Sequence, residues 1–212
     1  MAHILITSGP TRQYLDPVRY LSNASSGKMG CCLAQAALDL GHEVTIVSGP
    51  VSINYPAAAH VVEVVSTQEM LEAANKAFPE CNGVIAAAAP CDFKPKNFSQ
   101  QKIKTSSSFE LQLVETNDIL AELGSRKRPN QWSVGFALET EDGKTRALKK
   151  LKRKNCDLIV VNGPTAIDST HNQVDVISLD GSVVLSLAGP KETVAQGILK
   201  LIQANLINPD SL

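Results

Sequence analysis

The chain has 212 residues, of which 43% are hydrophobic, and a formal net charge of −1. This length suits one α/β domain covering residues 1–212, and the balanced charge argues against a generally basic nucleic-acid-binding protein and against an acidic disordered chain. Its five cysteines show no CxxC spacing, and no apolar run reaches the length of a membrane span. We therefore expect a soluble cytoplasmic protein with reduced thiols and no membrane partner.

The first half of the chain alternates apolar runs typical of buried strands with helical patterns. The predicted strands of this half cover 3–8, 43–48, 60–65 and 83–89. A helix is predicted from about Ser25 to Leu40, and another follows a capping box formed by Ser66 and Glu69. Such β-α-β units predict parallel strands joined by right-handed crossovers.

The second half continues the alternation and adds an antiparallel element. The predicted strands of this half cover 109–115, 132–137 and 157–162. Between them, the pattern predicts a short helix at 118–123 and a basic helix that ends near Asn155. An Asp-Gly turn between two apolar runs predicts a β-hairpin over 174–187, which is a candidate dimer element, and the last helix is predicted over about 190–205.

Together these elements predict an α/β fold, with a Rossmann-like, doubly wound, mostly parallel sheet flanked by helices and an appended C-terminal β-hairpin. In such sheets, ligands bind beyond the carboxyl ends of the strands. The candidate loops are therefore those after Ser8, Ser48, Ala89, Ala137 and Val161.

The segment NASSGKMG has features of an anion site but matches no standard phosphate loop. GxGxxG is absent, and Met29 stands where a Walker loop has its metal-binding Ser or Thr. The predicted helix opens with Ser25, Ser26 and Gly27. Its free amide groups and dipole favour a phosphate, whereas a serine N-cap without a ligand is the alternative. Asn23, just upstream, can offer a donor and an acceptor to a substrate.

A second group of candidate residues follows the small-residue run AAAAP. The loop after it carries a carboxylate and several lysines: Asp92, Lys94, Lys96, Lys102 and Lys104. Such a loop can close over a polyphosphate, with a lysine as a point charge, or it can be solvated surface.

The third group is the basic helix, where Arg146, Lys150 and Lys154 are four residues apart and share one face. A solvated face and a nucleic-acid patch are both compatible with this pattern. The balanced charge and the 4% aromatic content weaken the nucleic-acid interpretation, because stacking platforms are few. We therefore expect no nucleic-acid partner.

Eight segments, in chain order, resemble the phosphopantothenoylcysteine synthetase family over about residues 4–205: TSGPTRQYLDPVRYLSNASSGKMG, VTIVSGP, AAAAPCDF, KIK, NDIL, VGFALET, KKLKRKN and DLIVVN. This family is the ligase half of the bifunctional bacterial coenzyme A biosynthesis protein. The other half, a flavoprotein decarboxylase, has no counterpart in the chain. The resemblance therefore implies either a stand-alone synthetase or a domain that is fused to, or associates with, such a decarboxylase.

The resemblance implies a reaction and an assembly. 4'-Phosphopantothenate and L-cysteine would be joined at the expense of CTP, through an acyl-cytidylate, with Mg²⁺ as cofactor. The protein would be a homodimer with its active site near the subunit interface. Base selectivity for CTP over ATP does not follow from the residues themselves.

Roles of individual residues also follow from the resemblance. Asn23 and Lys102 would be catalytic, with Asn23 acting on the acyl-cytidylate. Substrate-binding positions would be Arg19, Ser25, Ser26, Gly27, Lys28 and Ala89. Nucleotide-binding positions would be Ala86, Ala87, Ala88, Asp92, Lys102, Asn117, Asp118, Ile119, Leu120, Phe136, Lys150 and Lys154. No metal ligand and no cysteine-binding residue is assigned.

The chain departs from the family pattern at three positions. Thr105 replaces the last lysine of the KxKK loop motif, Asn117 stands where proline is common, and Ala86 stands where glycine is common. Two other functions remain open from the residues alone. One is a dinucleotide-dependent oxidoreductase, suggested by the doubly wound pattern, and the other is a non-enzymatic nucleotide- or nucleic-acid-binding module that uses the basic helix.

Overall fold

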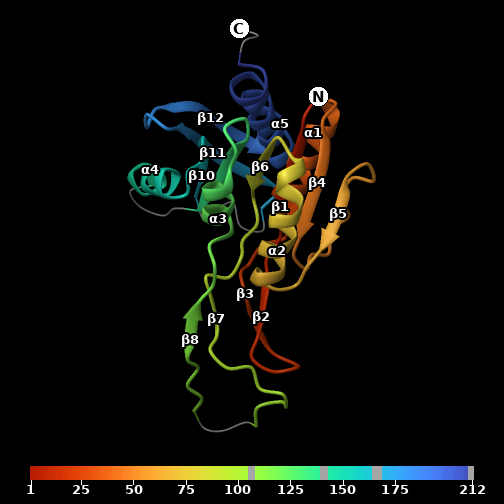
Figure 1. Cartoon of the computed structure of the whole chain (residues 1–212), viewed down its shortest axis with the longest axis vertical. Helices are drawn as coiled ribbons and strands as arrows, with labels where there is room; N and C mark the ends of the chain where they lie inside the picture. The colour runs from red at the N-terminus through yellow and green to blue at the C-terminus, as the bar shows by residue number, and fades with distance from the viewer. Residues whose placement is uncertain (105–107, 139–142, 164–168, 210–212) are drawn as a thin grey trace.

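The computed structural model describes residues 1–104, 108–138, 143–163 and 169–209. An eight-stranded sheet forms its centre (Figure 1). Its strands are β1 (His3–Ser8), β4 (Glu43–Ser48), β5 (His60–Glu63), β6 (Gly83–Ala86), β9 (Trp132–Leu138), β10 (Leu158–Asn162), β11 (His171–Ser178) and β12 (Val183–Pro190). Their spatial order is β12-β11-β10-β9-β6-β1-β4-β5.

The predicted fold class is confirmed. The strands from β5 to β10 pair in parallel, and in chain order they have the 3-2-1-4-5-6 arrangement of a Rossmann-like sheet. The C-terminal hairpin of β11 and β12 continues the sheet by antiparallel pairing with β10. The chain order reverses between β1 and β6, and ligand sites lie above such a reversal point.

Helices cover both faces of the sheet. One layer holds α1 (Lys28–Asp39) and α5 (Lys191–Ile202), and the other holds α2 (Thr67–Ala77), α3 (Ile119–Arg126) and α4 (Gly143–Arg153). A 3-10 turn (Phe78–Glu80) follows α2, and a π-helical turn (Gln203–Ile207) follows α5. In the described part of the chain, no helix has the length and hydropathy needed to cross a bilayer.

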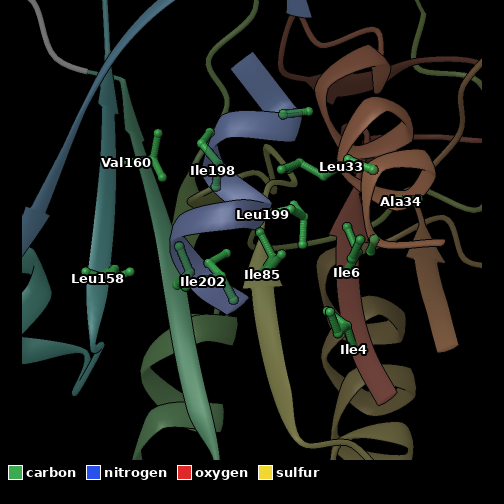
Figure 2. Close-up of a cluster of buried hydrophobic side chains, with 14 of the residues drawn as sticks. Ile4, Ile6, Leu33, Ala34, Ile85, Leu158, Val160, Ile198, Leu199 and Ile202 are labelled. Carbon is green, nitrogen blue, oxygen red and sulfur yellow. The ribbon is translucent and has the colours of Figure 1, made fainter. Parts of the chain in front are cut away.

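Two cores form because successive side chains of a strand point to opposite faces. Ile4 and Ile6 of β1 face α1 and α5, whereas Leu5 between them belongs to the core under α2 and α3. Figure 2 shows the first core, where Leu33 of α1 and Ile198 of α5 lie over the sheet.

Two short antiparallel pairs extend away from the sheet: β2 (Arg12–Tyr14) with β3 (Tyr20–Ser22), and β7 (Phe93–Pro95) with β8 (Leu113–Glu115) (Figure 1). We call these two pairs and their connections the arm. The sequence predicted a loop over 90–108 and a strand over 109–115, so the pairing with β7 was missed. Thr105, a departure from the family motif, lies outside the described residues.

Candidate active site

A cleft of about 540 Å³ opens at the carboxyl ends of β1, β6, β9 and β10. It brings together most of the predicted site: Asn23, Ser25, Ser26, Gly27, Lys28, Ala86, Ala87, Ala88, Ala89, Asp92, Asn117, Asp118, Ile119, Leu120, Phe136, Lys150 and Lys154. Among the described residues, the loop after Ser48 contributes none of the lining. Instead it packs behind Gly27, since a Cβ on Gly27 would lie 2.9 Å from Val51 Cγ1.

The start of α1 forms one wall of the cleft, but not as predicted. The helix begins at Lys28, and Gly27 precedes it with a φ of 75°, a left-handed conformation that favours glycine. Neither Ser25 nor Ser26 caps the helix, because it has no side-chain cap. The alternative of a serine N-cap is therefore wrong, and the amide groups of the first turn are available to an anion.

Asn23 lies beside the end of the small-residue run. Its Nδ2 donates hydrogen bonds to the carbonyl oxygens of Ala89 (3.2 Å) and Pro90 (2.9 Å). The amide oxygen of Asn23 is therefore the atom that can meet a substrate in this arrangement. The alanines at 86–88 leave room above the strand end because their side chains are small, and all three line the cleft.

The opposite wall comes from α3 and α4. Asp118 is the N-cap of α3, where its Oδ1 accepts from the backbone nitrogen of Ala121 (3.1 Å). The same oxygen lies 3.1 Å from Lys154 Nζ. This ion pair ties the end of α4 to the start of α3, so that Lys150 and Lys154 line one wall together. The shared face predicted for these two lysines is confirmed as a cleft wall.

Replacing Lys150 or Lys154 by methionine is expected to weaken the binding of a phosphate anion in the cleft by about tenfold, since each substitution removes a cation from the cleft wall. Lys152 lies on the same helix, is exposed and does not line the cleft. Lys152→Met should therefore leave the affinity unchanged. Calorimetric titration with inorganic pyrophosphate checks both expectations, and equal affinities for all variants would contradict the assignment.

Arg19 and Lys102 are the two predicted site residues that do not line the cleft. The guanidinium of Arg19 is bound to the buried carboxylate of Asp16, with Nε and Nη2 at 2.9 and 2.6 Å from Oδ2. The same two side chains hold both backbone groups of Ile103: its nitrogen donates to Asp16 Oδ2 (3.1 Å), and its oxygen accepts from Arg19 (2.8 Å). Arg19 thus anchors the segment that carries Lys102 and does not point into the cleft.

The hydrogen bond from Arg19 holds the pKa of the Asp16 carboxyl well below its usual range, although burial opposes this shift. A lowered folded-state pKa means that the ionised carboxylate stabilises the fold above the unfolded-state value of about 3.9, and that this stabilisation is lost as the pH falls toward the folded-state pKa. Asp16→Asn should therefore destabilise the protein at pH 7 but progressively less below about pH 4. Urea unfolding across this range measures the difference, and a pH-independent difference would contradict it.

Sequence reasoning missed several residues of the cleft. Asn162 ends β10, and the rule that ligands meet strand ends could have found it. Thr7 and Thr116 also line the cleft, and so do Asn172 of β11 and Lys191 of α5. The last two come from the C-terminal hairpin and helix, whose position beside α1 depends on the strand order of the sheet.

The thiols near this cleft are not activated. Burial and the neighbouring Glu192 carboxylate raise the pKa of Cys31, and the same causes raise that of Cys32 to about 11. Neither cysteine at the front of α1 is therefore activated as a nucleophile. No group of three or more metal-ligating side chains occurs among the residues that the structure describes.

The model of the DNA/pantothenate metabolism flavoprotein C-terminal domain family matches residues 1–206. The chain belongs to this family. The chain is 51% identical over 206 residues to a cysteine/cysteine sulfinic acid decarboxylase of an unknown prokaryotic organism. The aligned region covers 94% of this chain and 57% of the relative. The chain is 39% identical over 210 residues to the coenzyme A biosynthesis bifunctional protein CoaBC of Vibrio cholerae, with 96% and 52% covered.

The chain thus spans about half the length of the curated relatives it matches. A solved structure of the C-terminal domain of CoaBC covers the same region, with a TM-score of 0.84 and 40% identity over 97% of this chain and 96% of that one. The family and the α/β fold are therefore shown. The resemblance found in the sequence is confirmed at the level of this C-terminal domain.

Proposed function

We propose that this domain is a phosphopantothenate–cysteine ligase that uses CTP in coenzyme A biosynthesis. The observation that carries the proposal is the cleft itself. It combines Asn23, the uncapped start of α1, and Lys150 and Lys154 at the end of α4, in a domain similar to the C-terminal half of CoaBC. Asn23 suits a reacting acyl group, and the start of α1 and the lysines suit a polyphosphate.

In the first step, a carboxylate oxygen of 4'-phosphopantothenate attacks the α-phosphorus of CTP. A new oxygen–phosphorus bond forms, the bond to the bridging oxygen breaks, and pyrophosphate leaves with the electron pair. The amide groups at the start of α1, together with Lys150 and Lys154, supply positive potential where phosphate charge develops. No protein nucleophile takes part, in agreement with the absence of a GxSxG motif.

In the second step, the amine of L-cysteine attacks the acyl carbon of the acyl-cytidylate, and CMP leaves with the oxygen that came from the carboxylate. Asn23 Oδ1 accepts a hydrogen bond from the attacking amine and so orients it. Because Nδ2 is bound to the carbonyl oxygens of Ala89 and Pro90, the side chain is held for this role. The proton released by the amine passes to CMP or to solvent.

The carboxylates that line the cleft suit a Mg²⁺ ion that binds together with the nucleotide. Such ions keep several waters and need only one or two protein carboxylates besides the phosphates. Asp92 lines the cleft with an exposed carboxylate and would hold the ion, whereas Asp118 is already bound to Lys154. When bound, Mg²⁺ would neutralise phosphate charge.

We further propose a homodimer formed through the arm. Several large apolar side chains are exposed on it: Tyr14, Val18, Tyr20, Phe93, Phe98, Phe109 and Leu113. Such clustering is typical of an interaction surface. It favours the arm as the dimer element over the hairpin predicted at 174–187. Since Lys102 lies on the arm and outside its own cleft, we place it at the cleft of the other subunit.

No observation favours the alternative of a dinucleotide-dependent oxidoreductase. The loop after β1 holds the β2–β3 hairpin in place of a GxGxxG turn. The similarity to a cysteine/cysteine sulfinic acid decarboxylase covers 57% of that protein. We therefore assign decarboxylation to a partner domain outside this chain, such as the flavoprotein half of CoaBC implied by the sequence resemblance.

The proposal is tested by CMP release from CTP, with purified protein and Mg²⁺. CMP is expected in stoichiometric amounts with product only when both 4'-phosphopantothenate and L-cysteine are present, and AMP release from ATP is expected to be slower. If the pure protein releases no CMP under these conditions, the proposal fails.

A further inference from the structure

A chain of hydroxyl groups joins the loop after β4 to the start of α1. Tyr55, from this loop, donates its hydroxyl proton to Ser8 Oγ (2.9 Å), and Ser8 Oγ donates to the carbonyl oxygen of Gly27 (3.2 Å). Ser48, the last residue of β4, has its Oγ 2.8 Å from the Tyr55 hydroxyl oxygen. Tyr55, Ser8 and Ser48 do not line the cleft, so the roles described above leave these hydroxyl groups unused.

The carbonyl oxygen of Gly27 is the atom at which α1 begins. It accepts from the backbone nitrogen of Cys31 (3.1 Å), which is the first hydrogen bond of the helix, as well as from Ser8. On its other side, Gly27 continues the segment 23–28, which lines the cleft and carries Asn23. The left-handed Gly27 is therefore the turning point between this cleft segment and the helix, and the bond from Ser8 holds it.

The packing at this point is as close as the hydrogen bonding. Ser8 is fully buried, and a Cβ on Gly30, in the first turn of α1, would overlap Ser8 Oγ. A Cβ on Gly27 would lie 3.3 Å from the Tyr55 hydroxyl oxygen. Burial raises the pKa of Tyr55, so its phenol keeps the proton that it donates to Ser8 at neutral pH. The start of α1 thus rests directly on the two hydroxyl groups.

We propose that Tyr55 and Ser8 are positioning residues of the cleft, which hold Gly27 and thereby the segment 23–28 in the conformation that binds a phosphate group. This inference rests on the proposed function. Neither side chain touches the reacting atoms, since Tyr55 acts through Ser8 and Ser8 acts through Gly27. Polar groups that are fixed before a ligand arrives bind it without a cost of reorganisation, which is what this chain of hydrogen bonds supplies.

The test is binding of inorganic pyrophosphate, measured by calorimetry without turnover. Tyr55→Phe removes the hydroxyl group and keeps the ring, and it should weaken binding by about 3- to 10-fold, the effect of losing one hydrogen bond that holds the site. Thr45→Val is the matched control for a general loss of stability. It removes a buried hydroxyl group of β4 that is hydrogen-bonded to His3 (2.8 Å) and lies outside the cleft. Thr45→Val should bind as the wild type, and unchanged affinity in Tyr55→Phe would overturn the positioning role.

A double variant tests whether the two residues act in sequence. Ser8→Ala breaks the bond to Gly27 directly, so it should weaken binding at least as much as Tyr55→Phe. Adding Tyr55→Phe to Ser8→Ala should then cause no further loss of affinity. If the loss in the double variant equals the product of the two single losses, the residues act independently, and the chain through Ser8 is overturned.

Kinetics separates this inference from the proposed function. In Tyr55→Phe the KM for CTP should rise by about the factor by which the pyrophosphate affinity falls, whereas Thr45→Val should keep the wild-type KM. If the variants lose pyrophosphate affinity as described but the wild type releases no CMP, the positioning role stands and the proposed function fails. If the wild type releases CMP but binds no pyrophosphate, or if Tyr55→Phe keeps the wild-type KM, the positioning role fails and the proposed function stands.

Discussion

Replacing Asn23 by alanine is expected to lower the rate of product formation by about 10²- to 10³-fold, the range found when one preorganised polar group is removed from an acyl-transfer site. The amide is held by the carbonyl oxygens of Ala89 and Pro90, so its oxygen is positioned before the cysteine amine arrives. In the proposed mechanism, this oxygen takes no part in the first step. The variant should therefore release one equivalent of pyrophosphate rapidly and accumulate the acyl-cytidylate.

Rapid quench with radiolabelled CTP measures the intermediate and the product in the same experiment. Asn208→Ala, which removes an exposed asparagine outside the cleft, is the control and should behave as the wild type. Asn23→Asp retains an acceptor oxygen and should recover part of the second step. Product formation by Asn23→Ala at the normal rate would remove Asn23 from the mechanism.

Lys102→Met is expected to lose about 10²-fold or more in activity, because a cation that stabilises the phosphate charge is removed. Lys102 does not line the cleft of its own chain, and Asp16 and Arg19 bind the backbone of the neighbouring Ile103. If Lys102 serves the other subunit, a heterodimer of Asn23→Ala with Lys102→Met contains one site with both groups intact. Its activity should then be about half that of the wild-type dimer.

Two differently tagged variants, purified through both tags, provide this heterodimer. Each variant homodimer that carries both tags is the control and should remain nearly inactive. A heterodimer as inactive as its parents would show that Lys102 and Asn23 act within one chain. A monomeric wild-type protein would also rule out the shared site.

The sequence predicted the sheet well because its signals are local. The strands of the parallel sheet are short apolar runs between turn residues, and the capping box of α2 is formed as expected, with Ser66 Oγ accepting from the nitrogen of Glu69. The strand-end rule then located most of the cleft. The start of α1 was misplaced by three residues, because the left-handed Gly27 packs against Val51 from a distant loop.

The remaining differences between prediction and structure also arise from contacts between segments that are distant in the chain. The pairing of β7 with β8 joins segments that are distant in the chain, each only three residues long, so no local pattern signals it. Arg19 was expected at the substrate, but its contact with Asp16 and Ile103 depends on how the arm folds back. Lys191 and Asn172 reach the cleft only because the C-terminal hairpin extends the sheet beside β10.

The central claim is that the substrate carboxylate becomes activated as an acyl-cytidylate in this cleft. It is tested most directly by 4'-phosphopantothenate labelled with ¹⁸O in its carboxylate, incubated with the protein, CTP, Mg²⁺ and L-cysteine. Because the amine displaces CMP by breaking the acyl carbon–oxygen bond, each CMP should carry one ¹⁸O atom in its phosphate, as mass spectrometry would show. Unlabelled CMP, or label in inorganic phosphate with release of CDP, would contradict the account.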